Sequence, residues 1–231
     1  MATYNAERYI VDQINSILPQ LSTHDEIIIS DDYSTDKTIA LINSIKDNRI
    51  RIFYNENKKG PIKNFENAIR KSVNDYIFLA DQDDIWLKGK VDKCVESLGN
   101  CDLVVTDCIV VDNQLNVIHQ SYFDLVNSGV GLFKNLYRNT YLGCCMAFRR
   151  DLLKVGFPFP HDIPMHDIWL GFISELFFKS CFIKEPYVLY RRHENNTSTA
   201  THKSTNSLFA KLNFRINLIK QIPVLYIRKR K

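Results

Sequence analysis

Three aspartates and a glutamine follow directly on an apolar run in the stretch FLADQDDIW, residues 78–86. Carboxylates this close together repel one another, and apolar neighbours increase the repulsion, so a compensating partner is expected. Asp81 and Asp83 are two residues apart, so their side chains point the same way in extended backbone. Such a pair suits Mg²⁺, which usually binds one or two carboxylates, waters and phosphate oxygens. The alternative is an ordinary turn, with Asp84 as the N-cap of the next helix.

A second acidic pair, Asp31 and Asp32, follows the apolar stretch EIIIS at residues 26–30. Ligands of an open parallel sheet bind beyond the carboxyl ends of its strands. We therefore expect both acidic groups at one edge of the sheet, beside Thr3 and Tyr4 at the end of a first strand. Each group alone is equally well explained by turn chemistry. Two groups at neighbouring strand ends favour a bound cation and nucleotide.

Basic groups and a further carboxylate complete the set of candidates. The chain has eight glycines and contains neither a Walker A motif nor G-x-G-x-x-G, the glycine-rich loops that bind phosphates. If a nucleotide binds, a metal ion and basic side chains must therefore hold its phosphates. Arg191, Arg192 and His193 are candidates, because guanidinium groups match phosphate geometry; the alternative is a solvated strand end. Asp167 precedes an apolar helical run and is either a general base or a first-turn acid favoured by the helix dipole.

Composition restricts the class of protein. The chain has 231 residues, 45% of them hydrophobic, which predicts a globular protein, and we favour one domain. No run of about 18 apolar residues predicts a membrane-spanning helix, and the N-terminus lacks a secretory signal. The six cysteines have no zinc-binding spacing and are expected to be reduced, which predicts a cytoplasmic protein. The mildly acidic body excludes a uniformly basic nucleic-acid binder.

Hydrophobic periodicity predicts an α/β fold. Apolar residues recur at helical spacing after Asn5, which is a good N-cap residue. Strands then alternate with helices through the first hundred residues. This alternation predicts βαβ units and a mostly parallel sheet with helices on both faces. The second half is expected to be mixed α+β. The expected strands are residues 26–30, 49–55, 75–80, 102–112, 144–148 and 187–190, and the expected helices are 37–45, 62–72, 87–98 and 167–178.

Six motifs in this order resemble family 2 glycosyltransferases with the GT-A fold. They are MATYNAERYIVDQINSIL, IIISDDYSTDKT, FLADQDDIW, LGCCMAFRRDLL, MHDIWLGF and LYRRHENNTS, and they span roughly residues 1–200. The form of DQDDIW and of the HDIW helix is most similar to bacterial rhamnosyltransferase-type members, which build surface polysaccharide. The resemblance implies one domain over residues 1–207, with a nucleotide-binding half at 1–112 and an acceptor half at 113–207.

The resemblance also implies a role for each candidate residue. Tyr4 and Asp32 would contact the nucleotide base, with Thr3 and Asp31 nearby. Asp81 would lie by the ribose, and Asp83 would bind Mg²⁺ or Mn²⁺. Asp167 would be the catalytic base. Arg191 and His193 match a Y-R-x-H element, which implies positions near the diphosphate or the metal. The implied reaction is a single inverting displacement, from dTDP-rhamnose or a UDP-hexose to a saccharide or lipid-linked acceptor.

The chain departs from the family pattern at its start. Family members begin with an apolar strand of about five residues before the segment ATYN, and here Met1 stands where that strand should end. The loss of three or four buried apolar side chains costs roughly 5–12 kcal/mol, against a typical net stability of about 5–15 kcal/mol. We therefore expect this chain to be marginally stable or inactive, as a late start codon or a truncated gene would produce.

The C-terminal tail, residues 208–231, has seven basic residues and no acid, which leaves residues 1–207 with a net charge of −3. Leu208, Leu212, Ile216 and Ile219 recur at helical spacing, and Pro223 is expected to break the helix. The pattern is typical of an interfacial helix on an anionic membrane, and equally of a helix packed on the domain. Two other functions remain open: an inactive copy that binds glycan, and a nucleotidyltransferase, although the expected phosphate-binding signature is absent.

Overall fold

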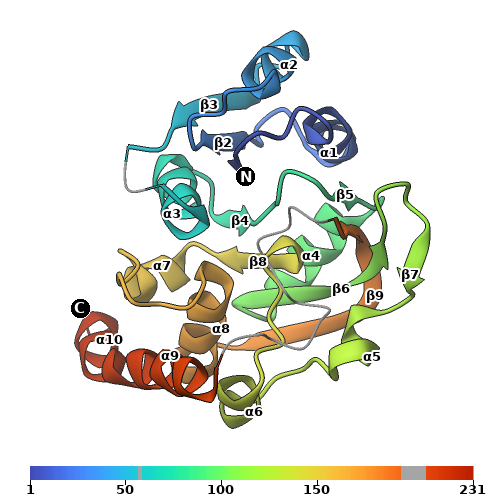
Figure 1. Ribbon diagram of the computed structural model, residues 1–231. Coiled ribbons are helices and arrows are strands. Elements are labelled where there is room, and N and C mark those ends of the chain that lie inside the picture. Colours follow the sequence, from blue (N-terminus) through green and yellow to red (C-terminus); the bar gives the residue numbers. More distant parts are fainter. Residues whose placement is uncertain (57–58, 194–206, 231) are drawn as a thin grey trace.

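The computed structural model describes residues 1–56, 59–193 and 207–230, and within these ranges the N-terminal part forms a three-stranded parallel sheet in the order β1–β2–β3 (Figure 1). Parallel pairing places Thr3 opposite Asp31, and Asp31 opposite Tyr54. The bounds in this part are β1 Ala2–Thr3, α1 Ile10–Ile17, a 3₁₀ turn Leu18–Gln20, β2 Ile27–Asp31, α2 Thr38–Ser44, β3 Ile50–Tyr54 and α3 Pro61–Lys71.

The second sheet, counted over the same ranges, has six strands in the order β4–β8–β6–β9–β5, with β7 paired to β6. Its only parallel pair among the described residues is β6–β9. The strands are β4 Tyr76–Phe78, β5 Ile85–Trp86, β6 Leu103–Val111, β7 Val117–His119, β8 Met146–Arg149 and β9 Ser180–Arg191. The α/β fold class is confirmed, with the parallel pairing concentrated in β1–β2–β3 and the second half mixed as expected.

Helices cover these sheets and complete the second half. Pro223 lies in the first turn of α10, and its position explains why the C-terminal segment is two helices, as expected from the sequence. Within the described residues, no helix is both long and apolar enough to cross a membrane. The remaining bounds are α4 Lys90–Leu98, α5 Tyr122–Val126, α6 Leu132–Tyr137, a 3₁₀ turn Gly143–Cys145, α7 Asp151–Gly156, α8 His166–Phe177, α9 Leu208–Lys220 and α10 Ile222–Lys229.

The hydrophobic core joins the two sheets. One cluster of buried side chains includes Ile29 of β2, Leu79 after β4, Leu103 of β6, Phe148 of β8 and Trp169 of α8. The expected boundary at residue 207 borders residues 194–206, which lie outside the described ranges, as does the end of the LYRRHENNTS motif.

Three local predictions are wrong, each for a tertiary reason. Helix α1 starts at Ile10, because Asn5 lies in a left-handed loop conformation where its Oδ1 accepts from the amide of Thr35 at 2.9 Å. Asp84 caps no helix, since α4 starts at Lys90 after β5. Strand β9 covers Ser180–Arg191 and not only 187–190, because it is sandwiched between β6 and β5.

The prediction of six reduced cysteines is wrong for one pair. Cys101 and Cys181 form a disulfide with a Cα–Cα distance of 6.1 Å. Val104 of β6 lies opposite Cys181 of β9, so the parallel pairing of these strands brings Cys181 close to the residues just before β6. Cys94, Cys108, Cys144 and Cys145 are buried thiols, as expected. The two cysteines are 80 positions apart, so their spacing in the sequence could not predict that they pair.

Candidate functional site

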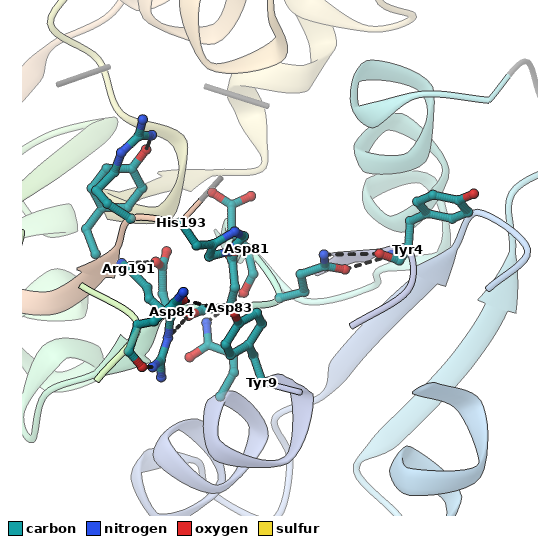
Figure 2. A network of polar contacts seen from close by, with 12 residues as sticks. Tyr4, Tyr9, Asp81, Asp83, Asp84, Arg191 and His193 are labelled. Atoms are coloured by element: carbon teal, nitrogen blue, oxygen red, sulfur yellow. Dashed lines mark hydrogen bonds and ion pairs between the residues drawn. The ribbon is translucent and has the colours of Figure 1, made fainter. Parts of the chain in front are cut away.

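The loop after β4 meets the end of β9, and this contact assembles the acidic stretch that stood out in the sequence (Figure 2). Oδ2 of Asp83 and Nε2 of His193 are 2.7 Å apart. Oδ1 of Asp84 accepts from the amide of Arg191 at 3.0 Å, and Nε of Arg191 donates to the carbonyl of Asp83 at 2.8 Å. Residues more than a hundred positions apart in the sequence therefore share one site.

Tyr9, which the sequence reasoning missed, supports this contact from the loop before α1. Its ring stacks on His193 with centroids 5.0 Å apart, and the guanidinium carbon of Arg191 lies 4.9 Å from the same ring centroid. Its hydroxyl donates to Oδ1 of Asn113 at 2.9 Å, and the Asn113 carbonyl accepts from Arg191 at 2.8 Å. Arg191 is buried, so its guanidinium holds β9, the acidic loop and Asn113 together.

The carboxylates of this loop are electrostatically crowded. Burial raises the pKa of Asp81 to about 7, and the neighbouring charges of Asp83 and Asp167 add to the shift. Burial, with Asp83 and Asp81, also raises the pKa of Asp84 well above its ordinary value. Asp81 is therefore within electrostatic range of Asp167, although 86 positions separate them in sequence. Such a group gains stability from any cation that binds among its oxygens.

Asp167 lies in the first turn of α8, directly beside the 3₁₀ turn that precedes β8. Its Oδ2 accepts from the amide of Gly143 at 3.1 Å, and its Oδ1 accepts from the amide of Ile168 at 2.7 Å. Burial raises the pKa of Asp167 to about 6, while these two backbone hydrogen bonds oppose the shift. Glycine is favoured at position 143, because an added Cβ would lie 3.1 Å from Nε2 of His166, a close contact.

Two sets of side chains in the described residues could hold a cation. Ligand atoms of Asp81, Asp84 and Cys144 lie within 4.8 Å of one another, but burial raises the pKa of Cys144 and keeps it a thiol, a poor ligand for Mg²⁺ or Mn²⁺. Asp83 and His193 offer a carboxylate and an imidazole. Their Nε2 and Oδ2 atoms share a hydrogen bond at 2.7 Å. Adjacent ligands of an octahedral ion at about 2.1 Å lie about 3 Å apart, so a cation can take the place of the shared proton with little movement of either side chain. Asp83 and His193 therefore fit the expected metal.

The other acidic pair accepts several hydrogen bonds from neutral donors. Asp31 accepts from the hydroxyl of Thr3 at 2.9 Å and from the amide and hydroxyl of Ser34 at 2.7 and 2.6 Å. Asp32 accepts from Asn55 Nδ2 at 2.8 Å and from the Gly60 amide at 2.7 Å. Thr3, Asp31 and Asp32 are all buried. These carboxylates shape the loops that follow β2 and β3.

Tyr4 presents an open aromatic face above these loops. Its amide donates to Oε1 of Gln82 at 2.7 Å, and Nε2 of Gln82 donates back to the Tyr4 carbonyl at 3.2 Å (Figure 2). The ring is 50% exposed, and Nζ of Lys59 lies 5.9 Å from its centroid and 5.7 Å from that of Tyr33. Gln82 thus connects the acidic loop to this aromatic surface; its position between Asp81 and Asp83 was the only signal in the sequence.

Comparisons with known proteins identify a family. The family model described as glycosyl transferase family 2 matches residues 1–157. The dTDP-rhamnosyl transferase RfbG of Shigella flexneri is 31% identical over 220 residues, which cover 85% of this chain and 72% of that protein. The UDP-Glc:alpha-D-GlcNAc-diphosphoundecaprenol beta-1,3-glucosyltransferase WfgD of Escherichia coli is 27% identical over 187 residues, 76% of this chain and 68% of that one.

Solved structures share the fold. Staphylococcus aureus TarS 1–349 in complex with UDP-GlcNAc aligns with a TM-score of 0.73 at 20% identity, covering 94% of this chain and 64% of that chain. The Pyrobaculum calidifontis mannosyltransferase PcManGT in complex with GDP-Man and Mn²⁺ aligns with a TM-score of 0.60 at 21% identity, covering 83% of this chain and 55% of that chain. The chain thus spans less than two thirds of the length of either structure.

Proposed function

Because the chain belongs to glycosyl transferase family 2, we propose that it transfers a sugar from a nucleotide-sugar donor to a hydroxyl group of a saccharide acceptor. One observation carries this proposal. Asp83 contacts His193, and burial raises the pKa of the neighbouring Asp81, with the negative charge of Asp167 close enough to add to that rise. The names of RfbG and WfgD support dTDP-rhamnose and UDP-glucose as the first donors to test.

Asp167 is the proposed catalytic base. Its carboxylate accepts the proton of the acceptor hydroxyl, whose oxygen forms a bond to the anomeric carbon of the donor. On the opposite side the bond from the anomeric carbon to the phosphate oxygen breaks, and the nucleoside diphosphate leaves, so the configuration inverts. A carboxyl whose pKa is about 6 suits this role, because it is ionised at neutral pH and basic enough to take the proton.

The nucleotide is proposed to bind along the edge formed by the ends of β1, β2 and β4. The exposed ring of Tyr4 can stack on the base, and Asp32 and Asp81 border the same edge. Thr3 and Asp31 act through the loop conformation that their hydrogen bond maintains. Arg191 is proposed to act in the same indirect way, because it anchors the loop that carries Asp83.

Asp83 and His193 are the proposed ligands of a divalent cation, Mg²⁺ or Mn²⁺. When bound, the cation supplies positive charge beside the departing diphosphate. The crowding of Asp81, Asp83 and Asp84 supports this assignment, because carboxylates with raised pKa values are stabilised by a nearby positive charge. His193 supplies a nitrogen ligand, which favours Mn²⁺ over Mg²⁺, because Mg²⁺ prefers oxygen ligands.

Thermal unfolding with Mn²⁺ and nucleotides tests the donor site. We expect Mn²⁺ and UDP or dTDP together to raise the melting temperature by several degrees, more than the sum of the two alone. Asp83→Ala should abolish this joint effect, whereas Asp92→Ala, at an exposed acid of α4, should preserve it. Release of nucleoside diphosphate from dTDP-rhamnose or UDP-glucose then identifies the donor. If neither donor is turned over and no nucleotide changes the melting temperature, the proposal is wrong.

We also propose that the face formed by α6 and α9 lies on an anionic membrane, where a lipid-linked acceptor would be presented. Phe133 and Tyr137 of α6 are 84% and 82% exposed, and Phe209 of α9 is 81% exposed. Arg215 connects the two helices, since its Nε donates to the carbonyl of Leu136 at 2.6 Å. Large exposed apolar side chains with basic residues between them are typical of interfacial surfaces.

The helices α9 and α10 also pack on the domain, so the two alternatives for the tail are compatible. Leu218 and Leu225 are buried, while Leu212, Ile216 and Ile219, at the spacing seen in the sequence, are exposed. Point variants are therefore a cleaner test than deletion of the tail. We expect Phe133→Ser with Phe209→Ser to reduce flotation with vesicles of 30% anionic lipid at least fivefold. Flotation equal to that of the unchanged chain would remove the membrane proposal.

A further inference from the structure

Lys90, the first residue of α4, is a buried lysine that the proposed mechanism does not use. It is 0% exposed. A buried ammonium group loses its hydration, and a positive charge in the first turn of a helix is opposed by the helix dipole. Both effects destabilise the fold, so contacts with other parts of the molecule must offset them. Those contacts indicate what Lys90 does.

Two contacts hold the ammonium group of Lys90. Its Nζ donates to the carbonyl of Cys144 at 2.6 Å, across 54 positions of the sequence. The same Nζ lies 4.0 Å from the ring centroid of Trp86, a distance at which the face of an indole attracts a cation. Trp86 lies in β5, directly after the acidic loop, and Cys144 lies in the 3₁₀ turn before β8. Lys90 therefore connects the end of the acidic loop to this turn.

The turn that Lys90 contacts also holds the proposed catalytic base. The amide of Gly143, the first residue of the turn, donates to Oδ2 of Asp167 at 3.1 Å. A Cβ added to Gly143 would lie 3.7 Å from the same Oδ2, so the backbone of the turn packs directly against the carboxylate. The carbonyl that Lys90 contacts belongs to the next residue, Cys144. A shift of the turn would therefore change the hydrogen bond that orients Asp167.

The backbone around Lys90 is anchored, which gives its side chain a fixed origin. The amide of Leu87 donates to the carbonyl of Tyr187 in β9 at 2.9 Å, and the amide of Lys90 donates to the carbonyl of Leu87 at 3.3 Å. Gly89 precedes the helix with a φ of 88°, a left-handed conformation that favours glycine. Helix α4 also contacts β8, the strand that follows the turn (Figure 1). Lys90 thus reaches the turn from a rigid element.

We propose that Lys90 is a positioning residue for Asp167. Its ammonium group holds the Cys144 carbonyl and so fixes the turn Gly143–Cys145, whose first amide orients the carboxylate of the base. This inference rests on the proposed transferase activity. Because Lys90 is buried, it touches neither donor nor acceptor, and it acts on the orientation of the base and not on the binding of the nucleotide.

A purely structural role for Lys90 would have a different signature. Replacement of a buried charged group by an apolar side chain of similar volume is often neutral or stabilising, because the cost of desolvation is removed. A base that is displaced by about 1 Å from its reacting geometry, however, loses up to about 10²-fold in rate. Loss of activity without loss of stability therefore distinguishes positioning of the base from support of the fold.

Lys90→Met, which keeps the length of the side chain but removes its N–H donors, tests the proposal. We expect kcat to fall about 10- to 100-fold while KM for the donor stays within about twofold and the melting temperature does not fall. Lys88→Met, at an exposed lysine two residues earlier, should leave kcat and KM unchanged. An unchanged kcat in Lys90→Met overturns the proposal. A clear fall in melting temperature in both Lys90→Met and Lys90→Leu also overturns it, because Lys90 would then support the fold.

The Asp167→Asn chain provides a second test, since a positioning effect requires the group that is positioned. In this background Lys90→Met should lower the residual kcat by less than about twofold. Multiplication of the two separate losses would overturn the proposal. The unchanged chain separates this inference from the proposed function. If it turns over no donor, both are wrong, whereas turnover by the unchanged chain and by Lys90→Met at the same kcat removes the inference alone.

Discussion

The two groups of aspartates at the strand ends look alike in the sequence but differ in what surrounds them. Asp31 and Asp32 accept hydrogen bonds from Thr3, Ser34, Asn55 and Gly60, all of them neutral donors. The group at residues 81–84 includes two carboxyls, Asp81 and Asp84, whose pKa values are raised by burial and by the neighbouring charge of Asp83. The first group thus stabilises loops, whereas the second favours a cation.

Acidic motifs that look alike in sequence differ in function according to what surrounds their carboxylates. A carboxylate that accepts several hydrogen bonds from neutral donors contributes to stability without a cation. A crowded carboxylate costs stability in the empty protein and recovers it when a cation binds. Removal of a carboxylate should therefore destabilise the fold in the first group and leave its stability nearly unchanged in the second. Four substitutions or measurements test this, in order of expected size.

Asp167→Asn should have the largest effect on activity. Loss of the proposed base should reduce kcat about 10³–10⁴-fold, roughly 4–5 kcal/mol in activation free energy. The fold should gain about 1–2 kcal/mol at pH 7.5, because the pKa of about 6 is above that of the unfolded chain. Because its pKa is raised in the folded state, protonated Asp167 stabilises the fold. This contribution is fully present below about pH 3.8 and is lost as the pH rises through about 6. Donor turnover and urea unfolding measure the two effects, and a loss of both activity and stability would indicate a structural role.

Asp83→Ala should reduce turnover about 10²–10³-fold, or roughly 3–4 kcal/mol, through loss of cation binding. Its melting temperature without metal should stay within about two degrees of the unchanged chain, because the substitution relieves repulsion from Asp81 and Asp84. Isothermal titration with Mn²⁺ measures the loss directly. If the Asp83→Ala chain still binds Mn²⁺ normally, Asp83 is not a metal ligand. The group of Asp81, Asp84 and Cys144 would then be the next candidate to test.

Asp31→Ala should instead destabilise the fold by about 2–3 kcal/mol. It removes the acceptor of three hydrogen bonds and leaves the buried hydroxyl of Thr3 without its partner at 2.9 Å. Urea unfolding measures the change, and Thr3→Val should show part of it. If Asp31→Ala leaves stability unchanged but abolishes nucleotide binding, Asp31 belongs with the second group and the comparison fails.

The pH dependence of kcat/KM should give the smallest effect, about tenfold or 1.4 kcal/mol for each pH unit. We expect kcat/KM to rise with unit slope as pH increases toward 6 and to level off above it, since Asp167 must be ionised to accept a proton. Saturating Mn²⁺ separates this from titration of Asp81, whose pKa of about 7 should fall when a cation binds. A profile that is flat between pH 5 and 8 would exclude Asp167 as the base.

Local sequence pattern was enough to predict much of the fold. The apolar runs before residues 31 and 81 are strands β2 and β4, and the helical periods give α2, α3, α4 and α8. These elements were predictable because burial of one face imposes a period on the chain. The acidic residues at the strand ends were equally visible, since the carboxyl ends of strands are where polar side chains collect.

Contacts between distant segments decided the rest. Strand β9 is long because β5 and β6 pair with it on both sides, and the disulfide depends on the same β6–β9 register. The roles of Arg191 and Tyr9 follow from their contacts with Asp83 and His193. No spacing could have shown them, because the residues in these contacts lie 108 to 184 positions apart. The same is true of the hydrogen bonds that distinguish Asp31 from Asp83. The sequence determined that carboxylates lie at these strand ends. Only the tertiary structure decided which donors and charges surround each one.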